Sequence, residues 1–307
     1  MGAADHDVTS GERLLGPVRG VTTTAADLQT VEAAYTRWLG YRVVERGVVA
    51  PETAQAWGAA AVAGCGLLVL EPESGEPTFL RFVRQEPPPG FKACTTWGWA
   101  ATEVIVRDAY ALADRLADSP FRVVGAPRPL DSSDSIHAMQ AIGPAGEMLY
   151  FAMVRRPIPG REMPLARSFV DRCFIAVLGA PDLPAAARFY DEVFGAPPNP
   201  TFVGRIRSLA GQNGLSPETR FELVTTELPT GSKIEIDQYL DFGRARPRPA
   251  GGLPAGMAMV TFECRDIDRF GDRMLAPPVA ARLPPHKGRR AGVLSGAAGE
   301  LIELVET

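Results

Sequence analysis

The sequence predicts an α+β chain built from four βαβββ modules. The segment DLQTVEAAYTRWLG from Asp27 and the segment DLPAAARFYDEVFG from Asp182 share Asp, Leu, Tyr and Gly at a constant spacing of 155 residues. A second pair, GPAGEMLYF from Gly143 and GAAGELIEL from Gly296, repeats at a spacing of 153 residues. Repeats at one spacing are the signature of a duplicated unit. The chain is therefore predicted to be a duplication of a unit of about 150 residues.

Each repeat divides into two modules. Asp108 follows the alternating run WAATEVIV, Asp266 follows MAMVTFEC, and both precede segments with apolar residues at helical spacing. An Asp at the start of a helix accepts hydrogen bonds from free backbone N–H groups, and alternation indicates a strand. Gly-rich turns such as GPAG and GAAG separate the later strands. The predicted modules occupy residues 17–90, 97–154, 170–242 and 256–306.

A segment rich in Pro and Arg, VRRPIPGREMPLARSF, lies between the two repeats and is typical of a linker. The predicted domains are therefore a flexible tail at 1–16, a first domain at 17–154, a linker at 155–169 and a second domain at 170–307. Another stretch with several prolines and arginines, residues 241–256, is expected to connect the last two modules.

Composition excludes several classes of protein. The chain has 307 residues, a formal net charge of -4, 46% hydrophobic residues and 22% charged residues. These values are typical of a globular protein, and the weak negative charge disfavours a nucleic-acid or anionic-membrane partner. No window approaches the roughly 18 apolar residues of a membrane span, and residues 1–15 lack an apolar signal region. We expect a cytoplasmic protein, with four scattered cysteines that form no disulfide framework.

The order of motifs resembles the vicinal oxygen chelate superfamily, the group of glyoxalases, bleomycin-resistance proteins and extradiol dioxygenases. The resemblance is strongest in IAVLGAPDLPAAARFYDEVFG, residues 175–195, and in GAAGELIELVE, residues 296–306. It implies two domains, each formed by two modules whose strands curl into a half-open barrel around a cavity. The superfamily includes lyases, isomerases, dioxygenases and binding proteins, so the fold alone does not give the reaction.

The resemblance also implies where metal ligands would lie. Family members with a metal place His, Gln or Glu seven residues before each Asp, but here those positions are Gly20, Ala101, Ile175 and Met259. The family's glutamate on the closing strand corresponds to Tyr150 in the first domain and Glu303 in the second. The chain has only three histidines, His6, His137 and His286. A two-histidine iron site is therefore disfavoured, and we predict no cofactor, although a divalent ion bound only by oxygen ligands is possible.

Strand parity assigns acidic residues to the predicted second-domain cavity. Glu303 and Glu263 fall on expected cavity faces, and SKIEIDQYL places Glu235, Asp237 and Tyr239 on the face opposite two isoleucines. Carboxyls crowded in a partly dry pocket raise one another's pKa, so one could hold a proton while another acts as a base. Glu303 is therefore expected to be buried beside another carboxylate with a raised pKa. These acids could also face water or pair with arginines.

The predicted first-domain cavity offers a competing site. Here His137 is the expected general acid or base, because its ordinary pKa lies near neutral. Tyr150 would donate a hydrogen bond to a carbonyl or enolate oxygen, and Glu103 and Arg81 would complete the site. His137 and Tyr150 could equally have a purely structural role.

Aromatic residues near these strands favour an apolar or aromatic ligand. The side chains expected to bind substrate are Arg81, Trp99, Met259, Glu235 and Tyr239. The expected function is a lyase or isomerase that acts on an apolar or aromatic oxygenated metabolite by acid-base chemistry, without a His-ligated metal. The alternative is a metal-free protein that sequesters a drug or natural product. A metal-dependent dioxygenase or glyoxalase is disfavoured by the missing ligands. The expected partner is a small molecule, and the expected state is a monomer or homodimer.

Overall fold

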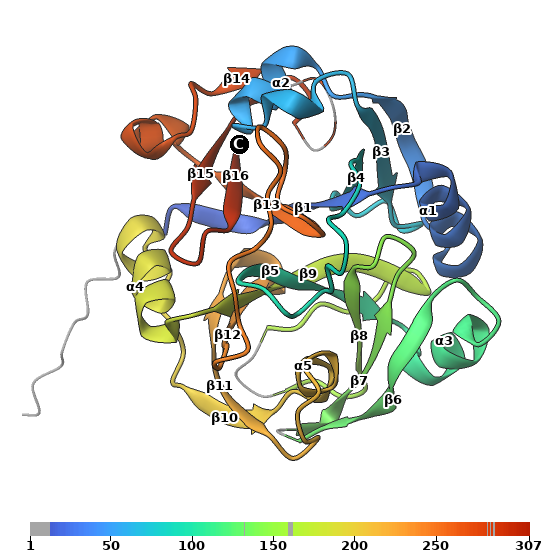
Figure 1. Ribbon diagram of the computed structural model, residues 1–307. Coiled ribbons are helices and arrows are strands. Elements are labelled where there is room, and N and C mark those ends of the chain that lie inside the picture. The colour runs from blue at the N-terminus through green and yellow to red at the C-terminus, as the bar shows by residue number, and fades with distance from the viewer. Residues whose placement is uncertain (1–12, 132, 159–161, 281, 283, 285) are drawn as a thin grey trace, which may run out of the picture.

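The strands of the protein form two curled sheets of eight strands each, stacked one above the other (Figure 1). The computed structural model describes residues 13–131, 133–158, 162–280, 282, 284 and 286–307. Most of the predicted tail, residues 1–12, and residues 159–161 of the predicted linker lie outside the described residues. The first strand begins at Leu15, two residues before the predicted start of the first module.

The strands of each sheet follow one another in space in an order that differs from their order in the chain. The first sheet is β14 (Val279–Ala280), β15 (Arg290–Ser295), β16 (Leu301–Glu306), β13 (Met257–Cys264), β1 (Leu15–Ala25), β4 (Phe79–Arg84), β3 (Gly66–Glu71) and β2 (Arg42–Val48). The second sheet is β10 (Phe202–Arg205), β11 (Arg220–Glu227), β12 (Lys233–Gln238), β9 (Val170–Ala180), β5 (Gly98–Val106), β8 (Met148–Val154), β7 (Ser133–Ile142) and β6 (Arg122–Leu130).

The four modules have the predicted order of elements, but they are grouped differently from the prediction. Antiparallel pairing of β1 with β13 joins the first and fourth modules in the first sheet. Antiparallel pairing of β5 with β9 joins the second and third modules in the second sheet. The sequence predicts that neighbouring modules share a sheet, one pair within residues 17–154 and the other within 170–307. The observed pairing of strands differs from this prediction. Each barrel is instead formed by two modules that pair through their first strands. The first module pairs with the fourth, and the second pairs with the third.

The helix that follows the first strand of each module begins where the sequence predicts. These helices are α1 (Leu28–Ala34), α3 (Ala109–Leu116), α4 (Leu183–Phe194) and the 3-10 helix η4 (Ile267–Arg273). Each starts after an Asp whose side chain accepts hydrogen bonds from backbone N–H groups: Asp27, Asp108, Asp182 and Asp266. The equivalence of Asp27 and Asp182 is confirmed, because both are N-caps at the same point of their modules. A π-helical turn, η1 (Tyr35–Leu39), continues α1.

Two short helices that the sequence did not predict cover the concave faces of the sheets (Figure 1). The helix α2 (Pro51–Ala56) lies between β2 and β3, and α5 (Arg207–Gln212) lies between β10 and β11. Both are insertions at the same place in equivalent modules. Two 3-10 turns, η2 (Ala60–Val62) and η3 (Pro229–Gly231), complete the elements of the described residues. Their place in the fold makes α2 and α5 part of any site on the concave faces.

The convex faces of the two sheets pack against each other and against the long helices to form the main core. The Trp99 indole on β5 is buried here and donates a hydrogen bond of 2.7 Å to the backbone oxygen of Leu301 on β16. This core therefore holds the two sheets together by apolar burial, at about 25 cal/mol per Å² of apolar surface.

The duplicated motifs meet in pairs across the core. The Tyr35 hydroxyl donates to the Glu147 carboxylate at 2.6 Å, and the Tyr190 hydroxyl donates to the Glu300 carboxylate at 2.8 Å. In each pair the tyrosine and the glutamate belong to modules of different sheets. Burial raises the pKa of both glutamates to about 7, although the tyrosine hydrogen bond opposes that shift. The repeated Tyr and Glu residues therefore form two equivalent hydrogen bonds between the two sheets.

We expect Tyr35→Phe to lower the free energy of unfolding by about 1 to 3 kcal/mol, because a buried carboxyl loses its hydroxyl partner. The equivalent variant Tyr190→Phe should cost a similar amount. Urea denaturation measures both, with Tyr110→Phe, which removes the hydrogen bond to His137 at the molecular surface rather than between the sheets, as the comparison. If the Tyr35 and Tyr190 variants are as stable as the wild type, these hydrogen bonds do not stabilise the packing of the two sheets.

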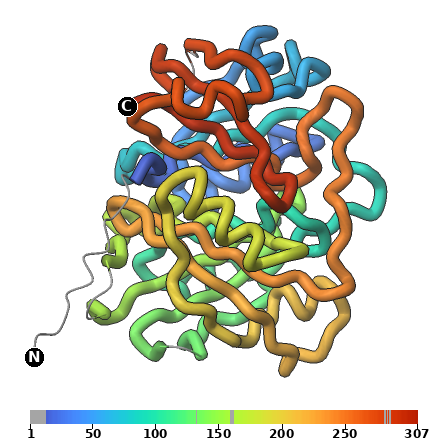
Figure 2. The backbone as a smooth tube through the Cα atoms, turned by 90° about the vertical axis from the view of Figure 1, so that its left-hand side faces the viewer, coloured from blue at the N-terminus to red at the C-terminus, as the bar shows by residue number. Residues whose placement is uncertain are grey.

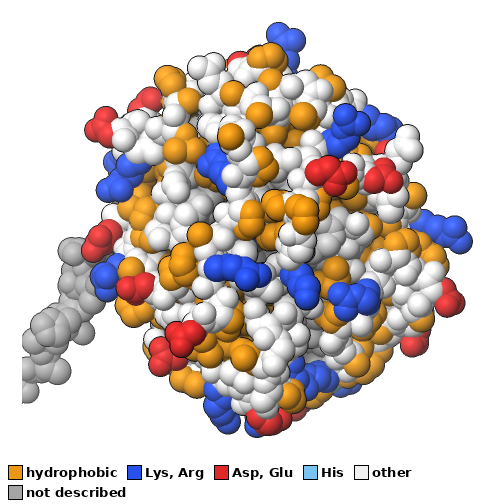
Figure 3. All heavy atoms as spheres, viewed as in Figure 1, with side chains coloured by type: hydrophobic (Ala, Val, Ile, Leu, Met, Phe, Trp, Pro, Cys, Tyr) orange, Lys and Arg blue, Asp and Glu red, His pale blue; other side chains and the backbone are white. Residues whose placement is uncertain are grey.

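The segment 241–256 runs along one side of the molecule from the second sheet to the first (Figure 2). The Arg246 guanidinium donates to the Thr96 hydroxyl at 3.0 Å and to the Met257 backbone oxygen at 2.7 Å, and Arg248 donates to the backbone oxygen of Gly58 at 2.7 Å. Figure 3 shows basic side chains across the middle of the same face that Figure 1 presents. No helix among the described residues is long and apolar enough to span a membrane.

Candidate functional site

Four equivalent positions define the centre of the two concave faces. The residue five positions before each helix-starting Asp pairs with the closing strand of the same module. These pairs are Thr22 with Arg81, Glu103 with Tyr150, Val177 with Glu235, and Thr261 with Glu303. Because Arg81 and Glu303 belong to the first sheet, and Tyr150 and Glu235 to the second, each barrel has its own pair of closing-strand side chains.

In the first sheet, these two side chains form a buried ion pair. The Arg81 guanidinium lies 2.7 Å from the Glu303 carboxylate, and both side chains are almost completely buried, with exposed fractions of 3% and 1%. Arg81 also donates to the Thr22 hydroxyl at 2.8 Å and lies over the Trp57 ring, 4.6 Å from its centroid. The guanidinium is thus fixed on three sides.

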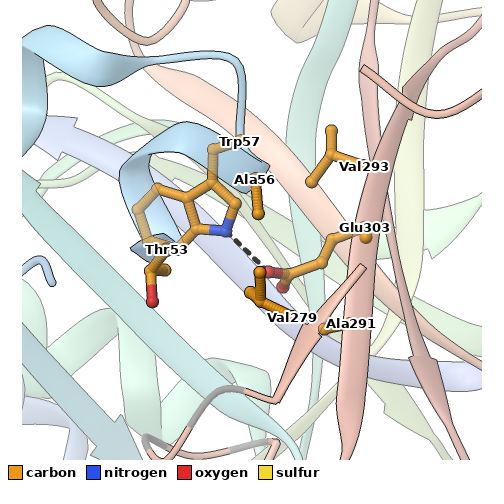
Figure 4. A pocket seen from close by; sticks show the side chains of 8 residues that line it. Thr53, Ala56, Trp57, Val279, Ala291, Val293 and Glu303 are labelled. Carbon is orange, nitrogen blue, oxygen red and sulfur yellow. Dashed lines mark hydrogen bonds between the residues drawn. The ribbon is translucent and has the colours of Figure 1, made fainter. Parts of the chain in front are cut away.

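Three more groups hold the Glu303 carboxylate. The Trp57 indole at the end of α2 donates at 2.8 Å (Figure 4), and the Thr261 hydroxyl donates at 2.5 Å. The His286 ring lies 3.0 Å away. Burial favours the neutral acid, but the charge of Arg81 and the contacts with His286 and Thr261 outweigh it, so the pKa of Glu303 lies well below its ordinary value. Glu303 is therefore an ionised structural anion.

This environment corrects the prediction for Glu303. The carboxyl is buried as expected, but its partners are cations and neutral donors, and its pKa is lowered where a rise was predicted. Glu263 lies farther along β13 and pairs with Arg19 at 2.8 Å. Glu235 and Asp237 belong to the other sheet. The predicted four-acid cluster is wrong because the second-domain strands were assigned to one barrel and are divided between two.

The concave face of the first sheet is filled by side chains. A small pocket beside Glu303 has no room for a water molecule (Figure 4). Its lining residues are Thr53, Ala56, Trp57, Val279, Ala291, Gly292, Val293 and Glu303. Met259 is completely buried in the apolar cluster on this face. Arg81 and Met259, both predicted to bind substrate, are therefore internal supports of a closed barrel.

The concave face of the second sheet gathers five of the predicted site residues. Glu103 and Tyr150 are neighbours on β5 and β8, and Glu235 and Asp237 alternate along β12 with Tyr239 following. These side chains share one face because the strand period is two. Strand parity predicted this face correctly for Glu103, Glu235, Asp237 and Tyr239, and the family resemblance indicated Tyr150, although the prediction divided the five between two cavities.

The polar groups on this face lack the internal partners that Glu303 has. The Tyr150 hydroxyl is hydrogen bonded to the Ser208 hydroxyl of α5 at 2.8 Å. Within the described residues, no hydrogen bond or ion pair satisfies Oδ1 of Asp237 or the hydroxyl of Tyr239, although both side chains are at least 97% buried. Native proteins seldom leave buried polar atoms without partners. A ligand on this face could supply the missing hydrogen-bond partners.

Gly179 makes room for the Tyr239 ring. A Cβ at position 179 would lie 2.4 Å from the Tyr239 ring, which no side chain could tolerate. Because Gly179 pairs with Asp237 across β9 and β12, the ring packs next to the carboxyl strand. The absence of a side chain at 179 thus positions an aromatic face on the concave side.

The three carboxyls on this face hold protons more strongly than ordinary acids. Burial and the negative charge of Glu235 raise the pKa of Glu103 to about 8, with Lys233 opposing the shift. Burial raises the pKa of Glu235 to about 7 and, with the charges of Glu235 and Glu103, raises the pKa of Asp237 well above its ordinary value. Glu103 and Glu235 are only partly buried and so can reach a bound molecule. The group can donate and accept protons near neutral pH.

An apolar lining surrounds these polar groups. It comes from both modules and from α5, and includes Met148, Ile175, Val177, Leu209 and Phe221. The Tyr239 and Phe242 rings lie 5.2 Å apart between centroids. A concave apolar face with a few polar groups is typical of a small-molecule site.

Two predicted site residues lie elsewhere. His137 on β7 lies beneath α3, where its Nδ1 is 2.7 Å from the Tyr110 hydroxyl. Gln140 is the residue of β7 that pairs with Tyr150, so His137, three positions away, points to the opposite face. Trp99 lies in the core between the sheets. The expectation that His137 and Tyr150 face one pocket is therefore wrong. His286 lies in the turn between β14 and β15 and contacts Glu303 of the first sheet, so the two histidines belong to different barrels.

The metal of the family does not fit the residues of either sheet. Gly20 and Met259 in the first sheet, and Ala101 and Ile175 in the second, offer no ligand at the family's positions. The Arg81 guanidinium already neutralises Glu303. Among the described residues, no group of three or more His, Cys, Asp or Glu side chains is arranged to hold a metal ion. Any chemistry derived for the second sheet therefore uses only the side chains of this chain.

Comparison with known proteins agrees with this architecture. A family model described as the Glyoxalase/Bleomycin resistance protein/Dioxygenase superfamily matches residues 172–301. Glyoxalase I from Zea mays has the same fold, with 14% identity, a TM-score of 0.60, and coverage of 94% of this chain and 92% of that chain. A candidate dioxygenase from Bacillus subtilis subsp. subtilis str. 168 matches with 14% identity, a TM-score of 0.59, and coverage of 96% and 86%.

These similarities confirm the resemblance to the vicinal oxygen chelate superfamily and its duplicated two-barrel fold. No curated protein matches the sequence. The superfamily contains small-molecule enzymes and a resistance protein, so it supports a small-molecule role and leaves the reaction open.

Proposed function

We propose that the protein is a small-molecule enzyme of lyase or isomerase type whose site is the concave face of the second sheet. The observation that carries this proposal is Glu103, a partly exposed carboxyl beside the Tyr150 phenol, with a pKa raised to about 8. A carboxyl that changes protonation near neutral pH is suited to proton transfer. The substrate would be an apolar or aromatic molecule with a carbonyl group, because the lining is apolar and phenols can donate to an oxygen.

The proposed reaction begins with proton transfer at carbon. The ionised Glu103 carboxylate takes a proton from the carbon next to the carbonyl, and the electron pair of that C–H bond forms an enolate. The Tyr150 hydroxyl donates a hydrogen bond to the enolate oxygen. The proton then returns to a neighbouring carbon in an isomerase, or a leaving group departs in a lyase. Glu235 controls the reaction through its charge, which raises the pKa of Glu103.

The test is exchange of the hydrogens next to the carbonyl with D2O, followed by proton NMR over a panel of aryl ketones and hydroxyketones. We expect exchange catalysed by the wild type to fall about 10²- to 10⁴-fold in Glu103→Gln. Glu222→Gln, an exposed change on β11 of the same sheet, is the matched control and should keep the wild-type rate.

The pH profile supplies a second readout. Glu103 acts as a base only when ionised, so the rate should rise with pH through about 8. Removing the charge of Glu235 in Glu235→Gln should move this midpoint to lower pH. Exchange that survives in Glu103→Gln, or no exchange with any compound of the panel, would contradict the proposed enzyme.

A ligand-binding protein that uses the same face is the second candidate. It is favoured by Ala101 and Ile175, which leave an apolar surface at the two positions where family members place metal ligands. Saturable binding of the panel compounds without any hydrogen exchange in the wild type is the result expected for this candidate.

A further inference from the structure

The concave face of the second sheet gathers three carboxyl groups that form no ion pair with a described basic side chain. Glu103, Glu235 and Asp237 have no ion-pair partner within the described part of the chain, although the charge of Lys233 acts on Glu103. The Lys233 ammonium group is bound to the Glu227 carboxylate. Burying a carboxylate without a cation beside it costs free energy. A bound cation would therefore stabilise the carboxylates of this face.

In the first sheet, a basic side chain of the protein itself neutralises the buried carboxylate. There Glu303 is matched by Arg81, the closing-strand residue of the partner module. In the second sheet the position of Arg81 is taken by Glu235, and the position of Glu303 is taken by Tyr150. The same fold thus places a guanidinium beside one carboxylate and a phenol beside the other. The second barrel therefore has a carboxyl where the first has its guanidinium, and no internal cation pairs with that carboxyl among the described residues.

Two further groups face the same space. Oδ1 of Asp237 and the Tyr239 hydroxyl are buried without hydrogen-bond partners among the described residues. The Tyr239, Phe242 and Phe221 rings form a continuous aromatic wall, with centroid distances of 5.2 Å and 6.4 Å. Aromatic faces attract organic cations, and carboxylates accept N–H hydrogen bonds from them.

We propose that the second barrel binds molecules that carry an organic ammonium group on an apolar body, with the ammonium held by Glu235 and Asp237 against the aromatic wall. This inference rests on the proposed function, because it places the ligand in the same site. The ammonium takes the role that Arg81 has in the first barrel, and Glu103 and Tyr150 face the rest of the molecule.

Three probes of one shape test the charge: 4-phenylbutylamine, 4-phenylbutanol and 4-phenylbutyrate. Binding is measured by NMR titration or calorimetry on the full chain at pH 8.5, where the glutamates are largely ionised. We expect the amine to bind about 10- to 100-fold more tightly than the alcohol, the gain typical of hydrogen bonds to charged groups. The butyrate should bind more weakly than the alcohol.

Two variants locate the ammonium. Glu235→Gln should remove about 10-fold or more of the amine's affinity and leave that of the alcohol unchanged, and Glu222→Gln should change neither. Tyr150→Arg places an internal cation on the closing strand opposite Glu235, so it should abolish amine binding, whereas Tyr150→Phe should retain it. Circular dichroism shows whether each variant is folded.

An alcohol that binds as tightly as the amine, or an amine whose affinity is the same in Glu235→Gln, would overturn the ammonium inference. Either result would leave the proposed proton transfer intact, since that is judged by exchange of ketone hydrogens in Glu103→Gln. Conversely, amine binding without any exchange would retain the ammonium site and remove the enzyme.

Discussion

Arg81→Met is expected to lower the free energy of unfolding by about 3 to 5 kcal/mol, the usual cost of leaving a buried charge without its partner. Glu303 would remain ionised or take up a proton in a place where Trp57, Thr261 and His286 are arranged for an anion. Urea denaturation at pH 7 measures the loss. Amine and ketone binding at the second sheet should be unchanged, because Arg81 supports the other barrel.

The double variant Arg81→Met/Glu303→Leu is the control for this interpretation. Removing both charges should restore most of the lost stability, since replacing a buried ion pair by apolar groups is often neutral. A single variant as stable as the wild type would contradict a buried structural pair. A double variant less stable than the single one would show that Glu303 stabilises the barrel through its other three contacts.

The free energy of unfolding should fall by several kcal/mol between pH 5 and pH 9, because each unit by which a folded-state pKa exceeds the unfolded one is worth about 1.4 kcal/mol. The cause is five buried acids with raised pKa: Glu103 at about 8, Glu147, Glu235 and Glu300 at about 7, and Asp237 well above its ordinary value. Such groups bind protons more strongly folded than unfolded. Their contribution is present below the unfolded pKa of about 4.3 and is lost as the pH rises through 7 to 8.

Glu147→Gln with Glu300→Gln should make this fall with pH smaller and leave the lower-pH branch unaltered. That branch has the opposite sign, because the pKa of Glu303 is lowered and its stabilisation is lost as the pH falls below about 4.5. Urea denaturation at intervals between pH 3 and pH 9 gives both branches. Stability that is flat or rising from pH 5 to pH 9 would contradict the assignment of the raised pKa values.

Much of the fold could be predicted from sequence because its signals are local. Each helix-starting Asp follows an alternating strand, and the repeat spacing shows which modules are equivalent. The pairing of modules is not local: β1 pairs with β13, over 230 residues away, and the repeat does not say which equivalent modules share a sheet. The helices α2 and α5 were missed because each is only six residues long and most of its stability comes from packing on a concave face.

The same difference between local and non-local signals applies to the site residues. Parity along a single strand correctly placed Glu103, Glu235, Asp237 and Tyr239 on concave faces. The partners of a residue depend on neighbouring strands, so the match of Arg81 with Glu303 could not be predicted. His137 was misplaced because its face depends on the register of β7 against β8.

Trp57 and Ser208, which contact Glu303 and Tyr150, come from the two short helices and carried no signal in the sequence. Their equivalence becomes visible only when α2 and α5 are seen at the same place in two modules. The repeated Tyr35 and Glu147 motifs were visible, but their contact depends on the packing of two sheets.

The central claim is that ligands bind at the second sheet and that the first barrel is closed by its own ion pair. A crystal structure of the protein soaked with 4-phenylbutylamine tests this most directly. The account predicts the amine between Tyr150, Glu235 and Asp237, with the Arg81 and Glu303 pair intact. A ligand bound beside Glu303, with Arg81 displaced and the second sheet empty, would contradict it.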